Sequence, residues 1–342
     1  MDLCTDVVLN SYVRLARNIK DWKYFSRLTG AEVGSLNLQQ GEAMDKLSDF
    51  TFRALDELSF SKRQLMVEKN LINPESIVSS GKYVATAPGV RPFVIFNEDD
   101  HIRIKCFVPG LDIFTAYNSC ADVEKRLRTV FEFQNHPKYG YLTAAVDDCG
   151  TGLHVYTTMF LPGLALDGKL DQFFKTADSS GVQVKGYVDT LDSTPKGCIF
   201  LIENQMAAGS SAMDVLIRMS DIYNNIVDME RESRSHVLEV KRLDIEDRVM
   251  RSYGIIQYCR KLTIWDALEL IADIKLGVCA GILKDMPENL DSLFIEMQKY
   301  HVLAEAMAGP FDKDDIDVDI LRADTLRKKL GIKEASIGQG SS

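Results

Sequence analysis

Hydrophobic residues follow two different repeats along the chain, and the change between them near residue 205 constrains the fold most. Before this point, short apolar runs and polar turns alternate with helical segments. From about residue 209, apolar side chains recur every three or four positions, as in a helix with one buried face. Leu216, Met219 and Tyr223 begin this stripe. We therefore predict an α+β domain at residues 1–235 and an all-α domain at residues 236–342.

One β-hairpin can be recognised directly in the sequence. The apolar run Phe93–Phe96 and the alternating run 102–108 are joined by the polar residues 97–100. Alternation of apolar and charged side chains is typical of a strand with one buried face, and a short polar turn joins antiparallel neighbours. The sheet is therefore expected to be antiparallel and flanked by helices, with further strands at residues 153–161 and 197–202.

Apolar spacing and capping residues predict several helices. Residues 122–131 show apolar positions on one side of a helix. The charged run 230–248 is expected to continue as one solvent-exposed helix. Thr263 and Asp266 have the spacing of a helix N-cap and its third residue. A last helix is predicted at residues 319–330.

Charge and cysteine usage restrict the class of protein. The formal net charge is −10, whereas a nucleic-acid-binding protein usually carries a basic excess. The seven cysteines are odd in number and none has CxxC spacing, which favours reduced thiols over a disulfide framework or a zinc site. The first six residues do not resemble a signal peptide, and no apolar run reaches the ~20 residues that span a bilayer. We expect a cytoplasmic protein with no metal, membrane or nucleic-acid partner.

Two clusters of charged residues are candidates for a functional site. Arg14 and Arg17 lie three positions apart, which suits an anion site or an ordinary surface turn or strand edge. Acidic residues and His101 precede Arg103, which suits metal or phosphate binding or simply a charged hairpin turn. The residues alone leave these alternatives open.

Several segments, taken in order, resemble the ATP:guanido phosphotransferases, and the bacterial protein arginine kinases of the McsB type in particular. The segments that resemble the catalytic domain are residues 6–18, 97–104, 140–143, 150–153 and 160–162. Residues 251–255 and 267–277 resemble the helical C-terminal domain of the protein arginine kinases. The resemblance extends from about residue 6 to residue 332. It implies a guanido-kinase catalytic domain, an all-α domain, and phosphoryl transfer from Mg-ATP to the guanidinium group of protein arginine.

The resemblance also identifies the nucleotide-binding positions. Phosphoryl transfer needs a cage of positive charge around the triphosphate. The family's five arginine positions correspond here to Tyr12, Arg14, Arg103, His154 and Lys185. Two arginines are therefore retained, and Lys185 lacks the planar fork that holds phosphate through two parallel bonds. Asn70 stands where the family has a histidine near the nucleotide.

The residues that would act on the guanidinium group are also changed. The carboxylate of the 97–104 segment is retained in shortened form as Asp99. The second catalytic glutamate corresponds to Thr190, or to Asp189 if the alignment shifts by one position. The reactive cysteine corresponds to Ala145, and Cys149, four residues later, is not expected to substitute simply. The resemblance thus implies Asp99 and Asp189 as the catalytic carboxylates.

In the helical domain, the family binds phosphoarginine through an Arg-Asp-x-x-Arg-Ala element. The matching residues here are Asp319, Arg322 and Ala323, and Val318 replaces the leading arginine. Asp319 and Arg322 are therefore the candidate phosphoarginine-binding residues.

These replacements predict a homologue of protein arginine kinase with impaired catalysis. Losing one preorganised donor costs about 2.7–4 kcal/mol of transition-state stabilisation, so the combined losses should slow the reaction by more than ~10⁴-fold. The expected protein is a pseudokinase that acts as a regulatory or scaffold protein. One alternative is an active kinase in which Lys185, His154 and Asp189 take over the missing roles. Another is a phosphoarginine reader that acts through the helical domain.

The resemblance also indicates ligands and partners. ATP and Mg²⁺ are expected if nucleotide binding survives, and no cofactor otherwise. The expected partners are an activator protein or a Clp-type protease regulator, together with a second copy of the chain in a homodimer.

Overall fold

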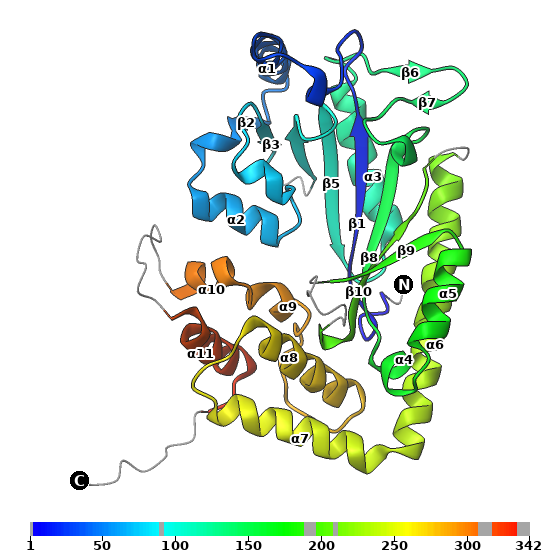
Figure 1. Ribbon diagram of the computed structural model, residues 1–342, viewed down its shortest axis with the longest axis vertical. Helices are drawn as coiled ribbons and strands as arrows, with labels where there is room; N and C mark the ends of the chain where they lie inside the picture. The colour runs from blue at the N-terminus through cyan, green and yellow to red at the C-terminus, as the bar shows by residue number, and fades with distance from the viewer. Residues whose placement is uncertain (1–2, 89–91, 188–195, 208–210, 307–316, 334–342) are drawn as a thin grey trace, which may run out of the picture. The chain divides into compact units, whose positions relative to one another are not determined.

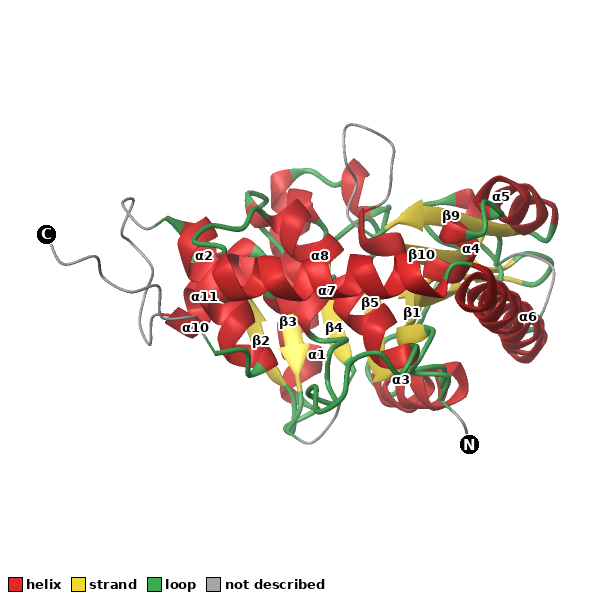
Figure 2. Cartoon of the chain, turned by 90° about the horizontal axis from the view of Figure 1, so that it is seen from below, coloured by secondary structure: helices red, strands yellow, loops and turns green. Residues whose placement is uncertain are grey.

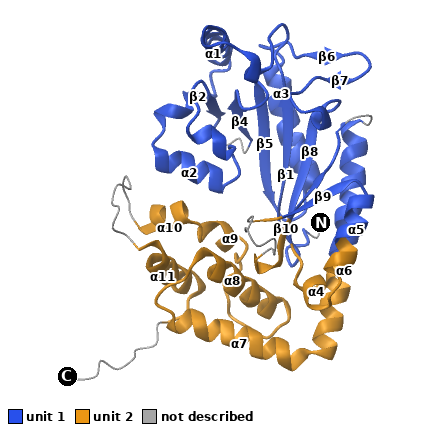
Figure 3. Cartoon of the chain, viewed as in Figure 1, with its two compact units in different colours: residues 1–159, 174–185, 201–227 blue, residues 160–173, 186–200, 228–342 orange. Residues whose placement is uncertain are grey.

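The structure is a computed structural model, shown in two views in Figures 1 and 2, and it describes residues 3–88, 92–187, 196–207, 211–306 and 317–333. The chain forms two compact units, coloured separately in Figure 3. The first comprises residues 1–159, 174–185 and 201–227, and the second comprises residues 160–173, 186–200 and 228–342. The predicted boundary between residues 235 and 236 stays a prediction. Within the described ranges, no helix is long and apolar enough to cross a membrane.

An eight-stranded sheet is the centre of the first unit, with the strand order β2-β3-β4-β5-β1-β8-β10-β9. Its strands are β1 (Val8–Arg17), β2 (Thr51–Ala54), β3 (Tyr83–Thr86), β4 (Phe93–Phe96), β5 (Ile102–Pro109), β8 (Leu153–Phe160), β9 (Val182–Gly186) and β10 (Ile199–Asn204). Strand β1 lies between β5 and β8 and pairs antiparallel with both, and β4 pairs antiparallel with β5. The predicted antiparallel sheet and the β4–β5 hairpin are therefore confirmed. A separate two-stranded sheet joins β6 (Asn135–His136) to β7 (Gly140–Tyr141).

Helices cover one face of the sheet. Side chains alternate between the two faces of a strand, so Val13, Leu15 and Arg17 of β1 share one face. Arg17 Nε donates to Glu124 of α3 (Ile113–Leu127) over 2.7 Å, which places α3 on that face. The buried hydroxyl of Tyr223, on α6 (Ala212–Val240), donates to a backbone oxygen of β8 over 2.9 Å. The side chains of β1 that alternate with these three point to the opposite face of the sheet.

On that opposite face, a hydrophobic cluster covers the outer strands. Phe93 and Ile95 of β4 pair with Lys105 and Arg103 of β5, so these four side chains point the same way. Phe93 and Ile95 pack with Leu55 and with residues near α2, and the full cluster comprises Leu55, Ile72, Val84, Phe93 and Ile95 with Leu58, Met66, Val67 and Leu71. The 3-10 segment η2 (Leu55–Glu57) and helix α2 (Phe60–Glu68) supply residues to this cluster. The same part of the chain also forms α1 (Gly30–Asp45) and the 3-10 segments η1 (Phe25–Arg27) and η3 (Pro74–Ile77). Beside the cluster, the same face of the middle strands β5, β1 and β8 carries charged and aromatic side chains.

From α6 on, the described chain is helical, as predicted from about residue 209. Its further helices are α7 (Arg242–Tyr258), α8 (Ile264–Cys279), α9 (Leu293–Glu296), α10 (Lys299–Ala306) and α11 (Val318–Leu330). Two shorter helices, α4 (Pro162–Leu166) and α5 (Leu170–Ser179), lie earlier, between β8 and β9. The predicted N-cap is confirmed, because the hydroxyl of Thr263 accepts the amide of Asp266 at the start of α8. The fold is therefore α+β, with an antiparallel sheet flanked by helices and a helical C-terminal region.

Two helix predictions had wrong bounds. The helix predicted at residues 122–131 is present as α3, with Val123 and Leu127 buried, but it ends at Leu127. It begins earlier, at Ile113, where Asp112 caps the first turn by accepting the amide of Thr115. The charged run 230–248 is not one helix, since Lys241, with φ −127° and ψ 30°, separates α6 from α7.

The charged run is also not fully exposed. Glu230 is buried, and its carboxylate accepts the backbone amides of Gly163 and Leu164 over 2.8 and 3.0 Å. These amides lie in the first turn of α4 and have no partner within that helix. A negative charge at a helix N-terminus is favourable, so Glu230 serves the packing of the second unit instead of facing solvent.

Candidate functional site

A row of basic side chains crosses the middle of the sheet on the face opposite α3. In the strand register, Arg14 of β1 lies directly opposite Lys105 of β5 and directly opposite His154 of β8. Arg103 lies two positions from Lys105 and therefore on the same face. Three of the cations predicted from the sequence are thus brought together on three adjacent strands. Lys105 is a fourth cation on this face, and it was not among the predicted site residues.

An aromatic row lies two positions along the same strands. Tyr12 is opposite both Phe107 and Tyr156, and its ring stacks on theirs with centroid distances of 4.5 and 4.2 Å. Tyr12 is 7% exposed and Tyr156 is 8% exposed. Residue 12, which the resemblance predicts to match a family arginine, is therefore a ring held between two other rings.

The buried carboxylate of Asp148 pairs with the guanidinium group of Arg14. Arg14 Nη2 donates to both oxygens of Asp148, over 2.7 and 2.8 Å. His154 Nε2 lies 2.5 Å from the same carboxylate. Burial raises the pKa of Asp148, but the contacts with His154 and Arg14 outweigh it and lower that pKa to about 2. Asp148 is therefore ionised at neutral pH, in the middle of the basic row.

A second carboxylate engages the other side of His154. Its Nδ1 lies 3.7 Å from Glu203, and Glu203 also pairs with Lys185 over 2.5 Å. Burial raises the pKa of Glu203, but the contacts with His154 and Lys185 lower it overall. Anions and cations thus alternate along the line Asp148, His154, Glu203 and Lys185.

Arg103 lies among three consecutive acidic residues of the β4–β5 turn. Its guanidinium group is 2.9 Å from Asp99, 3.1 Å from Asp100 and 3.5 Å from Glu98. The side chains of Asp100 and Glu98 are almost fully buried, whereas that of Asp99 is 63% exposed. Asp100 also accepts the amide of Ala144 over 2.7 Å. The predicted catalytic carboxylate Asp99 and the predicted phosphate ligand Arg103 are therefore paired with each other.

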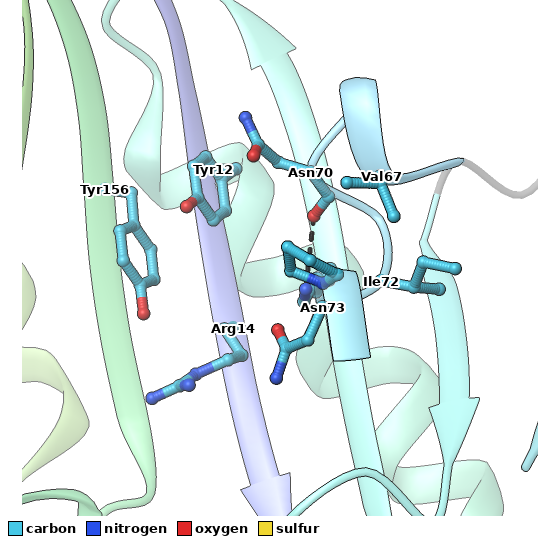
Figure 4. Close-up of a pocket in the computed structure, with 9 residues that line it drawn as sticks. Tyr12, Arg14, Val67, Asn70, Ile72, Asn73 and Tyr156 are labelled. Carbon is cyan, nitrogen blue, oxygen red and sulfur yellow. Dashed lines mark hydrogen bonds between the residues drawn. The ribbon is translucent and has the colours of Figure 1, made fainter. Parts of the chain in front are cut away.

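A cavity lies between this basic row and the hydrophobic cluster, and Figure 4 shows its lining residues. Asn70 lines it together with Arg14 and Tyr12. The backbone oxygen of Asn70 accepts a hydrogen bond from Lys105 Nζ over 3.1 Å. Two of the predicted nucleotide-binding residues, Arg14 and Asn70, are therefore brought to one cavity.

The remaining predicted catalytic positions are not brought together. Asp189 and Thr190 lie outside the described residues. Ala145 precedes the 3-10 turn η4 (Val146–Asp148), which returns Cys149 Sγ to 3.7 Å from the Ala145 oxygen. The thiol lies nearer to the family's cysteine position than four residues of separation suggested. Across the described part of the chain, no group of three or more His, Cys, Asp or Glu side chains is arranged to hold a metal ion.

The candidate phosphoarginine residues belong to the second unit. Arg322 donates to the backbone oxygens of Met297 and Leu262, each over 2.7 Å, and also pairs with Asp319. Arg322 is buried, so its guanidinium group is used to connect helices, whereas Asp319 is partly exposed. Phosphoarginine binding by this pair stays a prediction.

The counter-ions of the basic row and Lys105 were not predicted from the sequence. The alternation of β5 places Lys105 on the same face as Arg103, so the strand pattern alone was a usable signal. Asp148 and Glu203 gave no such signal, because their partners come from other strands and depend on strand order. Identifying them required the three-dimensional register.

The titration of His154 gives a pH-dependent contribution to stability. Burial alone would lower the pKa of His154, but contacts with Asp148 and Glu203 raise it above its usual value. Protonated His154 therefore favours folding at pH values below the unfolded pKa of about 6.5, and this contribution is lost as the pH rises through the raised folded pKa.

We expect the difference in unfolding free energy between the native chain and His154→Gln to shrink as the pH increases from acid to alkaline. Urea unfolding at a series of pH values measures it, and Lys20→Gln, an exposed lysine, serves as the control. A difference that is constant with pH would show that the imidazolium does not stabilise the fold.

Comparisons with known proteins place the chain among phosphotransferases. Residues 35–233 match the family model of the ATP:guanido phosphotransferase C-terminal catalytic domain. Residues 242–339 match the model of the protein-arginine kinase McsB C-terminal domain. These two matches cover most of the chain.

Curated relatives give the same result. The protein-arginine kinase of Syntrophomonas wolfei is 30% identical over 336 residues, which cover 95% of this chain and 92% of that protein. The protein-arginine kinase of Bacillus subtilis is 27% identical over 337 residues, which cover 96% of this chain and 91% of that protein.

Solved structures share the fold. The duplicated taurocyamine kinase from Schistosoma mansoni superposes with a TM-score of 0.62 at 19% identity, over 73% of this chain and 38% of that chain. A lombricine kinase superposes with a TM-score of 0.56 at 18% identity, over 69% of this chain and 68% of that chain. From the family matches and the curated relatives together, the chain belongs to the ATP:guanido phosphotransferase family and is homologous to the protein-arginine kinases.

Proposed function

We propose that this member of the family is a pseudokinase with strongly impaired phosphoryl transfer that acts as a regulatory or scaffold protein. One observation carries the proposal. The four cations at the family's phosphate positions, Arg14, Arg103, His154 and Lys185, each contact at least one carboxylate of the same unit.

Little positive charge on this face is available for a nucleotide. Stabilising a transferred phosphoryl group requires preorganised positive charge directed at its oxygens. Asp148 already accepts hydrogen bonds from Nη2 of Arg14 through both of its oxygens, over 2.7 and 2.8 Å, and its negative charge repels an incoming phosphate. Displacing such a buried anion leaves it without a partner, which is costly. The described residues of this face therefore do not fit a triphosphate, and no catalytic step is assigned to them.

The residues that would act on the acceptor guanidinium group are also less suited to catalysis. Ala145 cannot supply the thiolate that the family's cysteine provides. The candidate base Asp99 is exposed and paired with Arg103, so proton transfer would compete with an ion pair. Both changes add to the loss of positive charge and favour impaired catalysis.

Mass spectrometry of an acceptor protein tests the proposal. The chain is incubated with Mg-ATP and an arginine-containing protein that the Bacillus subtilis protein-arginine kinase phosphorylates under the same conditions. We expect phosphoarginine with the Bacillus enzyme, and a rate at least ~10⁴-fold lower with this chain. Phosphoarginine formation at a comparable rate would refute the pseudokinase.

The same assay addresses the alternative of an active kinase with a rearranged site. Two observations favour that alternative, namely the extra cation Lys105 beside Arg14 and the return of the Cys149 thiol toward Ala145. In that case ATP and Mg²⁺ would be substrates, and Mg-ATP would raise the melting temperature. The pseudokinase predicts no such rise at concentrations that saturate the Bacillus enzyme.

The regulatory role implies partners and a compartment. The proposed partners are an activator protein or a Clp-type protease regulator, with the chain acting as a homodimer in the cytoplasm. Mixing the purified chain with each candidate and measuring mass by light scattering tests this part. A strictly monomeric mass in every mixture would remove the scaffold role without affecting the catalytic argument.

A further inference from the structure

Two cysteine thiols meet in the core of the first unit, between the sheet and helix α3. Cys106 lies on β5 and Cys120 lies on α3, and both residues are 0% exposed. Val13 is directly opposite Cys106 in the strand register, so the side chain of Cys106 points to the face of the sheet that α3 covers (Figure 1). Neither thiol belongs to the candidate site, which lies on the opposite face.

The backbone around Cys106 locates the sulfur atom of Cys120. Cys120 Sγ lies 3.7 Å from the backbone oxygen of Val13, the residue opposite Cys106, and 3.8 Å from that of Ile104, two positions before it. Burial raises the pKa of the Cys120 thiol well above its usual value, and a hydrogen bond with the Cys106 thiol raises it further. The two sulfur atoms are therefore neighbours, and Cys120 is protonated at neutral pH.

Small side chains allow helix α3 to lie close to the sheet at this point. Ala116 is one turn before Cys120, is also 0% exposed and faces the same way. Neither side chain is long, so the backbone of α3 can approach β5 closely. A disulfide needs such an approach, because its two Cα atoms lie about 4.4–6.8 Å apart.

We propose that Cys106 and Cys120 are a modification site at which hydrogen peroxide forms a reversible disulfide. The thiolate of one cysteine attacks a peroxide oxygen, the O–O bond breaks, and the departing hydroxide takes up a proton to become water. The second thiol attacks the sulfenic acid that remains, forms the S–S bond, gives up its proton and releases a second water. Both thiols are thus oxidised, and the peroxide is reduced to water.

Burial sets the rate and the effect of this modification. Thiolates react with peroxide, whereas thiols do not, so the pair reacts when local opening of α3 admits solvent and the small, uncharged oxidant. Cys279 is exposed and should therefore react faster. The bond closes a loop between β5 and α3 and should make the oxidised chain harder to unfold. This modification goes beyond the proposed pseudokinase and does not depend on it.

Peptide mapping of the full chain tests the proposal. The chain is treated with hydrogen peroxide, in buffer and in urea just below the unfolding transition, and the remaining thiols are then blocked with N-ethylmaleimide in denaturant. No lysine or arginine separates the two cysteines, so trypsin releases both in one peptide, residues 106–125. We expect this peptide to lose both labels together and to weigh two hydrogen atoms less than its reduced, unlabelled form. Reduction with dithiothreitol before blocking should restore both labels.

Two variants complete the test. Cys120→Ala should abolish the bond and, with it, the higher urea midpoint of the oxidised chain. The matched control Cys279→Ala removes an exposed thiol and should form the bond as the native chain does. If Cys120→Ala does not fold, the mapping of the native chain decides alone.

Three outcomes of the mapping would overturn the proposal. The peptide of residues 106–125 could keep both labels in buffer and in urea, or it could carry sulfinic or sulfonic acid instead of the bond. A bond from Cys106 or Cys120 to any other cysteine would overturn it as well. Phosphoarginine formation, by contrast, bears on the pseudokinase alone.

Discussion

Replacing Arg103 by methionine is expected to lower the free energy of unfolding by about 3–5 kcal/mol. Arg103 is the shared cation of the β4–β5 turn, and Asp100 and Glu98 are almost fully buried beside it. Removing the guanidinium group leaves these two carboxylates in a low-dielectric environment with less positive charge to compensate them. Urea unfolding, followed by circular dichroism, measures the loss.

The matched control for this prediction is Arg242→Met. Arg242 pairs with Glu246 on an exposed helix surface, where an ion pair contributes about 0–1 kcal/mol. If Arg103→Met and Arg242→Met destabilise the chain equally, the acidic turn does not depend on its arginine. Such a result would also indicate that Asp100 is held by its hydrogen bonds from Asn18 and Ala144 alone.

Replacing Asp148 by asparagine is expected to create a response to Mg-ATP. The native carboxylate holds Arg14 through two hydrogen bonds and lies 2.5 Å from His154. Asparagine removes the negative charge, so the variant should be less stable alone, with Arg14 and His154 open to phosphate oxygens. A ligand at 100 times its dissociation constant adds about 2.7 kcal/mol of stability. Thermal unfolding with and without Mg-ATP measures the gain.

Asp49→Asn is the control for this experiment, because Asp49 pairs with Arg126 at the surface. We expect no response to Mg-ATP in that variant or in the native chain. An Asp148→Asn protein that folds but ignores Mg-ATP would show that carboxylate pairing is not what excludes the nucleotide. A native chain that responds as strongly as the variant would lead to the same conclusion.

The sequence predicted the fold most accurately where local pattern determines it. The β4–β5 hairpin was identified from alternation and a polar turn, and the start of α8 from the Thr263 cap. The predictions failed where tertiary contacts determine the structure. The charge pattern predicts that Glu230 is exposed to solvent, but Glu230 caps α4 from a position 67 residues away in the chain. Nothing in the local charge pattern distinguishes such a glutamate from an exposed one.

The candidate site could be predicted only in part for a related reason. Arg14, Arg103 and His154 could be assigned from the family resemblance, and strand register confirms that Arg14 and His154 are neighbours. Their neutralisation could not be predicted, because Glu203 lies 49 residues after His154 and meets it only through the order of the strands. Sequence positions indicate which basic residues are retained. The three-dimensional structure indicates whether a carboxylate already pairs with them, so that their charge is no longer available to a nucleotide.

The stacked ring of Tyr12 couples residue 12 to its neighbours. An arginine there would forfeit two ring contacts, each worth about 0.5–1.5 kcal/mol, and would add a cation next to Arg14 and Lys105. Such a substitution is therefore unfavourable in the present surroundings unless Tyr156 or Lys105 changes as well.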